Sequence, residues 1–316
     1  MTDSLSGREP ALTGAPLEAI TGSEPMLGGE RFTEQWRAHL LERLHDPHMT
    51  HYRRLNAGRW LADSGDDRAG IGLTDDGLPD ILWQLIPAGV AHIGDRHGHD
   101  ESFMVERFYM AAYPVTWAQY RVFLTDENGH RDPQWWADLH RREEYDRQAP
   151  PLANYPAQEV SWYDAVACCR WLSARSGVQV RLPTEWEWQH AANGGDPTRI
   201  FPWGQRWNAQ YANTRESRLR QVTAVGMYPH AESMHGVLDL CGTVLEWCSN
   251  LYADPANTNL HDPRERVLRG GSWFLIKDYA HTFFRTGYDP YNRYHSVGFR
   301  LVTGDPRPQP AETDHA

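Results

Sequence analysis

The sequence has few cysteines, and they are not spaced as a disulfide framework would be. Its 316 residues contain Cys168, Cys169, Cys241 and Cys248, and the adjacent pair would lie on different faces of one helix. Free cysteines of this kind are usually buried. We therefore interpret all four as buried, reduced thiols and expect a cytoplasmic protein.

Long apolar runs and an excess of basic side chains are also lacking. No stretch approaches the length that spans a bilayer, and the N-terminus has no basic start followed by a hydrophobic segment. Acidic residues outnumber basic ones by 42 to 31, giving a formal charge of −11, whereas nucleic-acid binding needs clustered Lys and Arg. We expect neither a membrane nor a nucleic acid as partner.

The character of the chain changes along its length. Apolar residues recur at every fourth position in "ERFTEQWRAHLLERLHDP", which predicts an amphipathic helix, and "HYRRLNAGRWLADSGD" predicts a second one. After a turn-rich stretch, "ILWQLIPAGVAHIG" predicts two short strands broken at Pro87 to Gly89. The predicted organisation is a disordered segment 1–30, a helical lead-in 31–66, a linker 67–83, a main domain 84–303 and a disordered tail 304–316.

Three further helix starts are predicted inside the main domain. Thr116, Ser161 and Thr184 each precede a helical pattern, and Gln119 and Glu187 follow the first and last of them by three residues. The rest of the domain is short, polar and rich in Gly, Pro and aromatic residues. We expect irregular loops packed around large side chains, which accounts for the 14 Trp residues.

Several blocks, in order, resemble the signature of the formylglycine-generating enzyme family, also called the sulfatase-modifying-factor domain. They are "AAYPVTWAQYRVFL", "YPAQEVSWYDAVACCRWLSARSGVQVRLPTEWEWQHAANGG", "FPWGQRWN", "GVLDLCGTVLEWCSNLY", "RVLRGGSWF" and "VGFRLV". The resemblance implies an α+β, loop-rich variant of the C-type-lectin fold, preceded here by the small helical lead-in. It also implies that calcium is often bound.

The copper site of the family's oxidases is not expected in this chain. Those enzymes hold copper with two cysteines between the Gly-Gly-Ser and Gly-Phe-Arg blocks, since soft sulfur ligands select Cu(I). Alignment from Gly270 puts Ala280 and Arg285 at these positions, while Cys241 and Cys248 lie in another block. We expect no copper and no formylglycine-generating activity.

A second branch of the family, the sulfoxide synthases, binds non-heme iron through histidines of an extra helical domain with an H-x3-H-x-E pattern. The lead-in here does not have that spacing, and its histidines are His39, His45, His48 and His51. His92, His97 and His99 offer another metal-binding group, but their Gly and Asp neighbours favour a solvated loop. We do not expect iron, and keep an oxygen-dependent non-heme iron oxidoreductase as the alternative function.

Calcium is the metal that the resemblance favours. The family's calcium loop corresponds to "LDLCGTVLEW", where Asp239 and Glu246 supply carboxylates and Gly242 and Val244 supply carbonyl oxygens. Ca²⁺ prefers hard oxygen ligands from one compact loop. The alternative interpretation is that Glu246 is a buried hydrogen-bond acceptor.

The segment between the two C-terminal blocks has the composition of an antibody-like binding surface, in which aromatic residues supply contact area and small polar residues supply hydrogen bonds. Its candidate ligand-binding residues are Phe274, Leu275, Ile276, Tyr279, Thr286, Tyr288, Asp289, Tyr291, Asn292, Tyr294, His295 and Ser296. Arg285, Asp289 and Arg293 are open to a second interpretation, as a structural ion-pair network. Asp289 and Pro290 favour a turn.

Some non-catalytic family members are diversified in this segment by retroelements that mutate adenines. An AAC codon mutated in this way encodes many of the residue types found here, although ordinary members also favour Tyr and Asp. The favoured hypothesis is a non-enzymatic recognition module that presents residues 274–296 to a protein or small-molecule ligand. The N-terminal helices would then serve for partner binding or self-association.

Overall fold

The computed structural model describes residues 34–94, 100–141 and 152–307. The predicted disordered segment 1–30, most of the predicted tail and the candidate ligands His97 and His99 lie outside the described residues.

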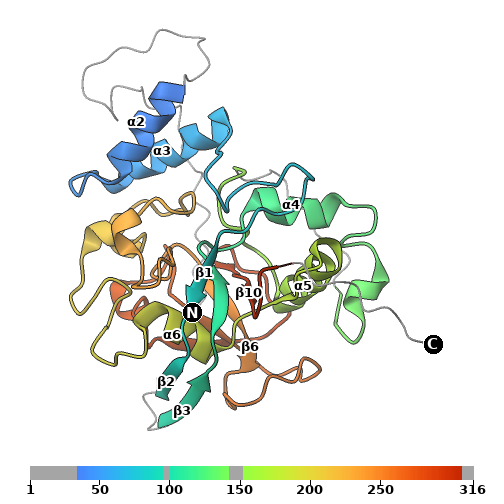
Figure 1. Ribbon diagram of the computed structural model, residues 1–316. Helices are drawn as coiled ribbons and strands as arrows, with labels where there is room; N and C mark the ends of the chain where they lie inside the picture. The colour runs from blue at the N-terminus through green and yellow to red at the C-terminus, as the bar shows by residue number, and fades with distance from the viewer. Residues whose placement is uncertain (1–33, 95–99, 142–151, 308–316) are drawn as a thin grey trace, which may run out of the picture.

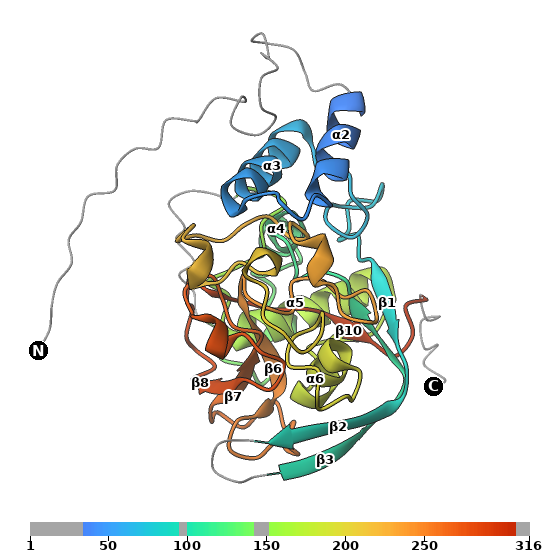
Figure 2. The same cartoon turned by 90° about the vertical axis from the view of Figure 1, so that its left-hand side faces the viewer.

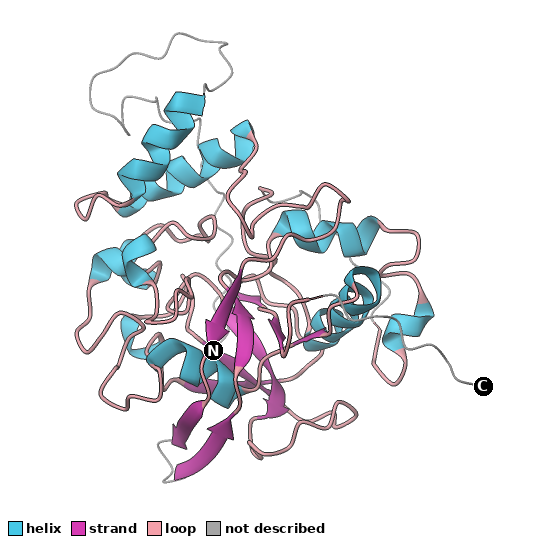
Figure 3. Ribbon diagram, viewed as in Figure 1, coloured by secondary structure: helices cyan, strands magenta, loops and turns pink. Residues whose placement is uncertain are grey.

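Short helices and strands alternate with long irregular connections (Figure 3). The α-helices are α2 (Glu34–Leu44), α3 (His51–Ser64), α4 (Trp117–Thr125), α5 (Trp162–Ser176) and α6 (Glu185–Asn193). The strands are β1 (Trp83–Ile86), β2 (Gly89–Gly94), β3 (Asp100–Val105), β4 (Phe108–Ala111), β5 (Val180–Arg181), β6 (Leu245–Leu251), β7 (Arg266–Arg269), β8 (Arg285–Tyr288), β9 (Val297–Gly298) and β10 (Val302–Thr303). Short 3₁₀ turns include η1 (Pro133–Trp136), η2 (Ala209–Tyr211), η3 (Arg215–Ser217), η4 (Pro229–Ala231) and η5 (Lys277–Tyr279).

In the part of the chain that the structure describes, the strands form three small sheets. One has the order β1-β4-β10-β5 and another the order β8-β7-β6-β9, in which only the β6–β9 pair is parallel. The β2–β3 hairpin is separate, and in both views it extends from the domain at the end opposite to α2 and α3 (Figures 1 and 2). This mixed, loop-rich architecture confirms the predicted fold class.

The predicted helix starts are present, and each has a capping box. Thr116 with Gln119 caps α4, and Thr184 with Glu187 caps α6. Ser161 caps α5 together with Asp164, a reciprocal partner that the sequence analysis did not identify. In a capping box, the side chain of the capping residue accepts the backbone N–H of the third helical residue, whose own side chain accepts the backbone N–H of the capping residue. Both N–H groups would otherwise have no partner within the helix.

The two N-terminal helices are packed onto the main domain. Arg54 of α3 is buried and donates to the carbonyls of Leu44 and Met227, both at 2.8 Å. Gly58 lies so close to the domain that a Cβ there would stand 2.7 Å from the Cβ of Ala224. The inward side of α3 is therefore occupied by this chain's own domain, and any partner would have to use the outward sides of α2 and α3.

Large aromatic side chains form the core, as the sequence predicts. Trp162, Trp171, Trp188 and Trp247 are all fully buried. The four cysteines are buried and unpaired, and burial raises the pKa of each thiol; that of Cys169 rises to about 12. They are neutral core residues.

One buried ion pair links the two larger sheets. Glu246 of β6 and Arg300, which follows β9, are both fully buried and joined by hydrogen bonds of 2.8 and 2.9 Å. Arg300 also donates to the carbonyls of Ala111 and Ala112 at the end of β4, and the indole of Trp188 donates to Glu246. The chain thus closes around a charged pair whose hydrogen bonds are satisfied from several elements.

Within the described residues, no helix is both long and apolar enough to cross a membrane.

Removing the charge of Glu246 should strongly destabilise the fold. The Glu246→Gln variant leaves the buried guanidinium of Arg300 without a counter-charge, which costs about 3–5 kcal/mol of unfolding free energy. Urea denaturation measures this difference. The matched control is Glu265→Gln, at an exposed position beside β7, which should lie within about 0.5 kcal/mol of the unsubstituted protein. Equal stabilities for both variants would contradict the proposed role of the pair.

Candidate recognition face

The segment 274–296, which we call the recognition face, runs between two fixed ends. At its start Gly271 adopts a φ of +71°, and a Cβ there would lie 2.5 Å from the carbonyl oxygen of Tyr279. Only glycine fits such a turn. At its end β9 pairs with β6, and Leu245 donates to the carbonyl of Ser296 at 2.8 Å.

Two arginines of the face point into the domain and hold it in place. Arg285 donates to both carboxylate oxygens of Glu185, at 2.7 and 2.8 Å. Arg293 donates in the same bidentate way to Asp164, with both distances 2.7 Å. Because Glu185 and Asp164 are completely buried, these pairs are structural, which supports the ion-pair interpretation for both arginines.

Asp289 has a different role from the two arginines. Its carboxylate accepts the backbone N–H of Tyr291 at 2.9 Å, and the carbonyl of Pro290 accepts the N–H of Trp162 at 3.1 Å. An Asp side chain bonded to the amide two residues ahead is a typical turn motif. The predicted turn at Asp289 and Pro290 is present, and it places Tyr291 next to α5.

Aromatic side chains gather at two places on the face. Phe274 and His295 meet across the segment with ring centroids 6.0 Å apart, and both contact Trp273. Tyr288 and Tyr294 form the second group, with centroids 5.0 Å apart. The structure therefore brings together predicted residues from both halves of the segment.

Tyr291 packs against residues from outside the segment. Its ring centroid lies 5.0 Å from the ring centroid of Tyr163 on α5 and 5.1 Å from that of His140. Burial, together with the neighbouring Tyr291, raises the pKa of Tyr163 to about 12. The phenol of Tyr163 is therefore neutral near pH 7.

The other predicted residues are less exposed. Leu275 packs on the main core, Tyr279 packs on Phe284 with centroids 5.1 Å apart, and Thr286 pairs with Leu268 of β7. Ile276, Asn292 and Ser296 are half-buried. The predicted residues that are exposed are Phe274, Asp289, Tyr291, Tyr294 and His295.

The positions aligned with the copper-binding cysteines are occupied by structural residues. Ala280 is fully buried in a small cluster with Phe201, Ala212 and Cys241, and Arg285 is held by Glu185. A copper-thiolate centre has no donor at either position.

The predicted calcium loop is compact, but Glu246 is already engaged. Both of its carboxylate oxygens accept from Arg300, and one also accepts from Trp188, which favours the alternative interpretation of Glu246 as a structural acceptor. Asp239 is buried with a φ of 57° and accepts the N–H of Gly226 at 2.6 Å. Its carboxylate and the loop carbonyls of Gly242 and Val244 are the donors that fit Ca²⁺. Calcium binding stays a prediction.

The histidines of the described residues belong to no three-ligand cluster, although His45 lies beside His230 and His190 beside His235. His51 bonds the phenol of Tyr228 at 2.9 Å, His45 packs against His230, and His92 bonds Ser102 at 3.0 Å. Across residues 34–94, 100–141 and 152–307, no three His, Cys, Asp or Glu side chains are arranged to hold a metal ion.

The residues that support the recognition face from within the domain were not predicted from the sequence. Glu185 pairs with Arg285, and Asp164 pairs with Arg293. Tyr163 and His140 pack against the ring of Tyr291. Asp164 lies in the capped first turn of α5, a signal that could have identified it. Arg293, which pairs with Asp164, is 129 positions away in the sequence, so no local sequence pattern identifies these residues as partners.

Comparisons with known proteins agree with this fold. The model of the sulfatase-modifying factor enzyme 1-like domain family matches residues 81–304. The hercynine oxygenase of Mycolicibacterium smegmatis is 28% identical over 83% of this chain and 69% of its own length. The inactive C-alpha-formylglycine-generating enzyme 2 of Bos taurus is 30% identical over 80% of this chain and 94% of its own length.

Solved structures share the fold at lower sequence identity. Treponema denticola variable protein 1 superposes with a TM-score of 0.56 at 20% identity, covering 72% of this chain and 96% of that protein. PvdO of Pseudomonas aeruginosa has the same TM-score at 19% identity, covering 75% and 100% of the two chains. These likenesses concern the fold alone.

The stabilising effect of Asp164 should depend on pH. Burial alone would raise the pKa of this carboxyl, but the ring of His130 at 3.6 Å, the hydrogen bonds from Arg293 and Ser161 and the charge of Arg293 outweigh burial and lower the pKa to about 2. Since the ordinary value is 3.8, the contribution is complete well above that pH and is lost as the pH falls toward about 2.

Urea denaturation of the Asp164→Asn variant tests this dependence. At neutral pH the variant should lose about 3–5 kcal/mol of unfolding free energy, because Arg293 stays without its counter-charge. The difference in unfolding free energy between the variant and the unsubstituted protein should become smaller as the pH is lowered from about 4 to about 3. Asp254→Asn, at an exposed position, is the control and should show neither effect. A pH-independent difference would contradict the assignment.

Proposed function

We propose that this chain, which belongs to the sulfatase-modifying factor enzyme 1-like domain family, is a non-enzymatic recognition module that binds a partner through residues 274–296. One observation carries the proposal. The positions that would hold the copper-binding cysteines are a buried alanine, Ala280, and an ion-paired arginine, Arg285, while aromatic side chains protrude from the same segment.

The exposed aromatic residues support a binding role. Phe274 is 58% exposed, Tyr291 37% and Tyr294 39%, although the backbone between them is held by buried ion pairs. Rigid aromatic side chains supply much contact area at a small entropic cost, and they are enriched among residues that dominate binding energy. The neighbouring Asp289 and His295 add hydrogen-bonding groups at the edge of this surface.

A protein is the partner class that we favour. The protruding side chains come from both halves of the segment, and their rings meet in pairs, as in the contact of Phe274 with His295. An extended set of anchors suits a macromolecular surface, which offers several pockets at once. Diversification of this segment by a retroelement stays a prediction.

The alternative function is an oxygen-dependent non-heme iron oxidoreductase. The observation that favours it is the similarity to hercynine oxygenases, at 28% and 30% identity over 83% of this chain. Its candidate ligands include His97 and His99, which lie outside the described residues. In this case, loss of both histidines would remove metal and turnover together.

Replacing three tyrosines of the face should abolish partner binding. A phage-displayed library of random peptides, selected on the unsubstituted protein, supplies defined ligands whose affinity can be measured. We expect the triple variant Tyr288→Ala, Tyr291→Ala and Tyr294→Ala to weaken this binding by at least about tenfold, because truncating an aromatic anchor costs about 2 kcal/mol or more.

Tyr52→Ala is the matched control for the triple variant. Tyr52 is 45% exposed, but it lies on α3 and not on the recognition face, so its loss should leave peptide binding unchanged. Thermal unfolding establishes that each variant is folded. Peptides that bind the folded triple variant as tightly as the unsubstituted protein would refute the proposed face.

Calcium is the metal that we propose for this scaffold. Elemental analysis of protein prepared without chelators should give calcium and no stoichiometric copper or iron, and added Ca²⁺ should raise the temperature of unfolding. Asp239→Asn removes the buried carboxylate and should abolish that rise, whereas Asp278→Asn in η5 should retain it. One tightly held iron per chain would instead favour the oxidoreductase.

A further inference from the structure

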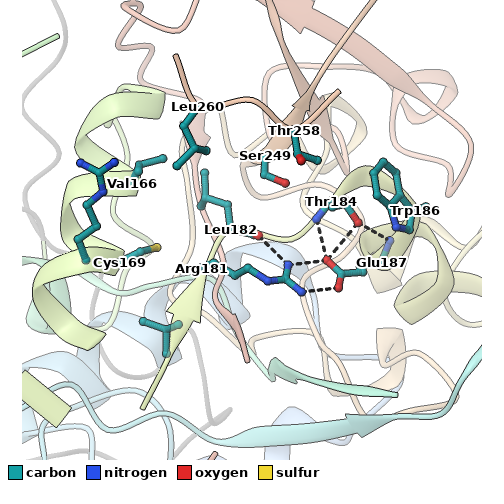
Figure 4. A pocket seen from close by; sticks show the side chains of 12 residues that line it. Val166, Cys169, Arg181, Leu182, Thr184, Trp186, Glu187, Ser249, Thr258 and Leu260 are labelled. Atoms are coloured by element: carbon teal, nitrogen blue, oxygen red, sulfur yellow. Dashed lines mark hydrogen bonds and ion pairs between the residues drawn. The ribbon is translucent and has the colours of Figure 1, made fainter. Parts of the chain in front are cut away.

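A cavity of about 530 Å³ is lined by residues outside the recognition face (Figure 4). Val166 and Cys169 of α5 form one side, and the first turn of α6, with Trp186 and Glu187, forms the other. Leu182, which follows β5, lies between these two sides. This volume is within the range of pockets that hold small molecules.

The lining of the cavity is mainly apolar. Val166, Val180 and Leu182 are buried, and the ring of Trp186 is half-buried. Burial raises the pKa of Cys169 to about 12, so its thiol stays protonated and behaves as an apolar group. Hydroxyl groups are added by Ser249 of β6 and by Thr258 in the loop that follows it.

The charged side chains at the cavity have hydrogen-bond partners within the protein. Arg181 donates to both carboxylate oxygens of Glu187, at 2.6 and 2.7 Å, as the dashed lines in Figure 4 mark. Glu187 also closes the capping box of α6 with Thr184. Arg170 donates to two backbone carbonyls, at residues 135 and 137. A charged ligand would therefore have to compete with existing hydrogen bonds of these side chains.

The cavity walls are held in place by contacts outside it. Arg266 is fully buried, stacks 4.0 Å above the ring of Trp162, and donates to the carbonyls of Ser249 and Asn259. It thereby ties the loop carrying Thr258 to β6. On the opposite side, the ring of Trp186 stacks on the ring of Phe103 in β3, with the two ring centroids 4.5 Å apart. A cavity with fixed walls binds without the entropic cost of ordering them.

We propose that this cavity is a binding site for a small, uncharged and mainly apolar molecule with one or two hydrogen-bonding groups. The apolar body would contact Val166, Leu182 and Trp186, and the hydroxyl groups of Ser249 and Thr258 would meet the polar groups of the ligand. None of the residues that line this site belongs to the recognition face.

N-phenyl-1-naphthylamine is a suitable probe, because it is neutral and fluoresces more strongly in apolar surroundings. Its matched anionic analogue is 8-anilinonaphthalene-1-sulfonate, which carries the same ring system. We expect saturable binding of the neutral probe to one site per chain, and at least about tenfold weaker binding of the anion. Tighter binding of the anion would overturn the inference about ligand charge.

Two substitutions test the location of the site. Thr258→Trp, in an exposed loop, and Ser249→Trp each place a large ring in the cavity, and each should weaken binding of the neutral probe by at least about tenfold. Leu85→Trp, at an exposed position of β1, should not. If Ser249→Trp fails to fold, Thr258→Trp decides alone.

The recognition face supplies the remaining control. The variant with Tyr288, Tyr291 and Tyr294 replaced by Ala should bind the neutral probe normally, since none of these residues lines the cavity. Loss of probe binding in this variant, with full binding in Thr258→Trp, would move the site to the face and overturn the inference. Absence of saturable binding to the unsubstituted protein would overturn it as well.

Discussion

The pairing of Glu246 with Arg300 is the interaction on which the rest of the structure depends. Burying a charge costs much free energy unless the charge is paired and its hydrogen bonds are satisfied. The two side chains must therefore lie together in the folded protein. Arg300 meets that demand through Glu246 and through carbonyls of Ala111 and Ala112, which come from the other large sheet. The C-terminal end of the segment is thereby fixed, and its start follows β7, where Arg269 pairs with Glu246 in the β6–β7 ladder.

The segment itself contains two more arginines that are paired with buried carboxylates. Arg285 reaches Glu185 and Arg293 reaches Asp164, each with two hydrogen bonds to a completely buried carboxylate. These two arginines therefore point inward and define the course of the backbone, while aromatic side chains such as Tyr294 remain available outside. Such a division lets the outer residues vary without loss of the fold, because the stabilising contacts are made by others.

Local signals account for the part of this structure that the sequence could predict. A capping residue and its partner are three positions apart, so the starts of α4, α5 and α6 could be located from Thr116, Ser161 and Thr184. The family blocks supplied the fold class. The supports of the face could not be found in this way, because Glu185 and Arg285 are 100 positions apart and nothing in either neighbourhood marks the other as its partner.

The first turn of α6 is where the recognition face and the cavity meet. Its two glutamates point to different sides: Glu185 holds Arg285 of the face, and Glu187 holds Arg181 at the cavity. The capping box that Glu187 closes, and the hydrogen bonds between Glu185 and Asn250, fix both side chains at once. Contacts from this one turn therefore support both the recognition face and one wall of the cavity.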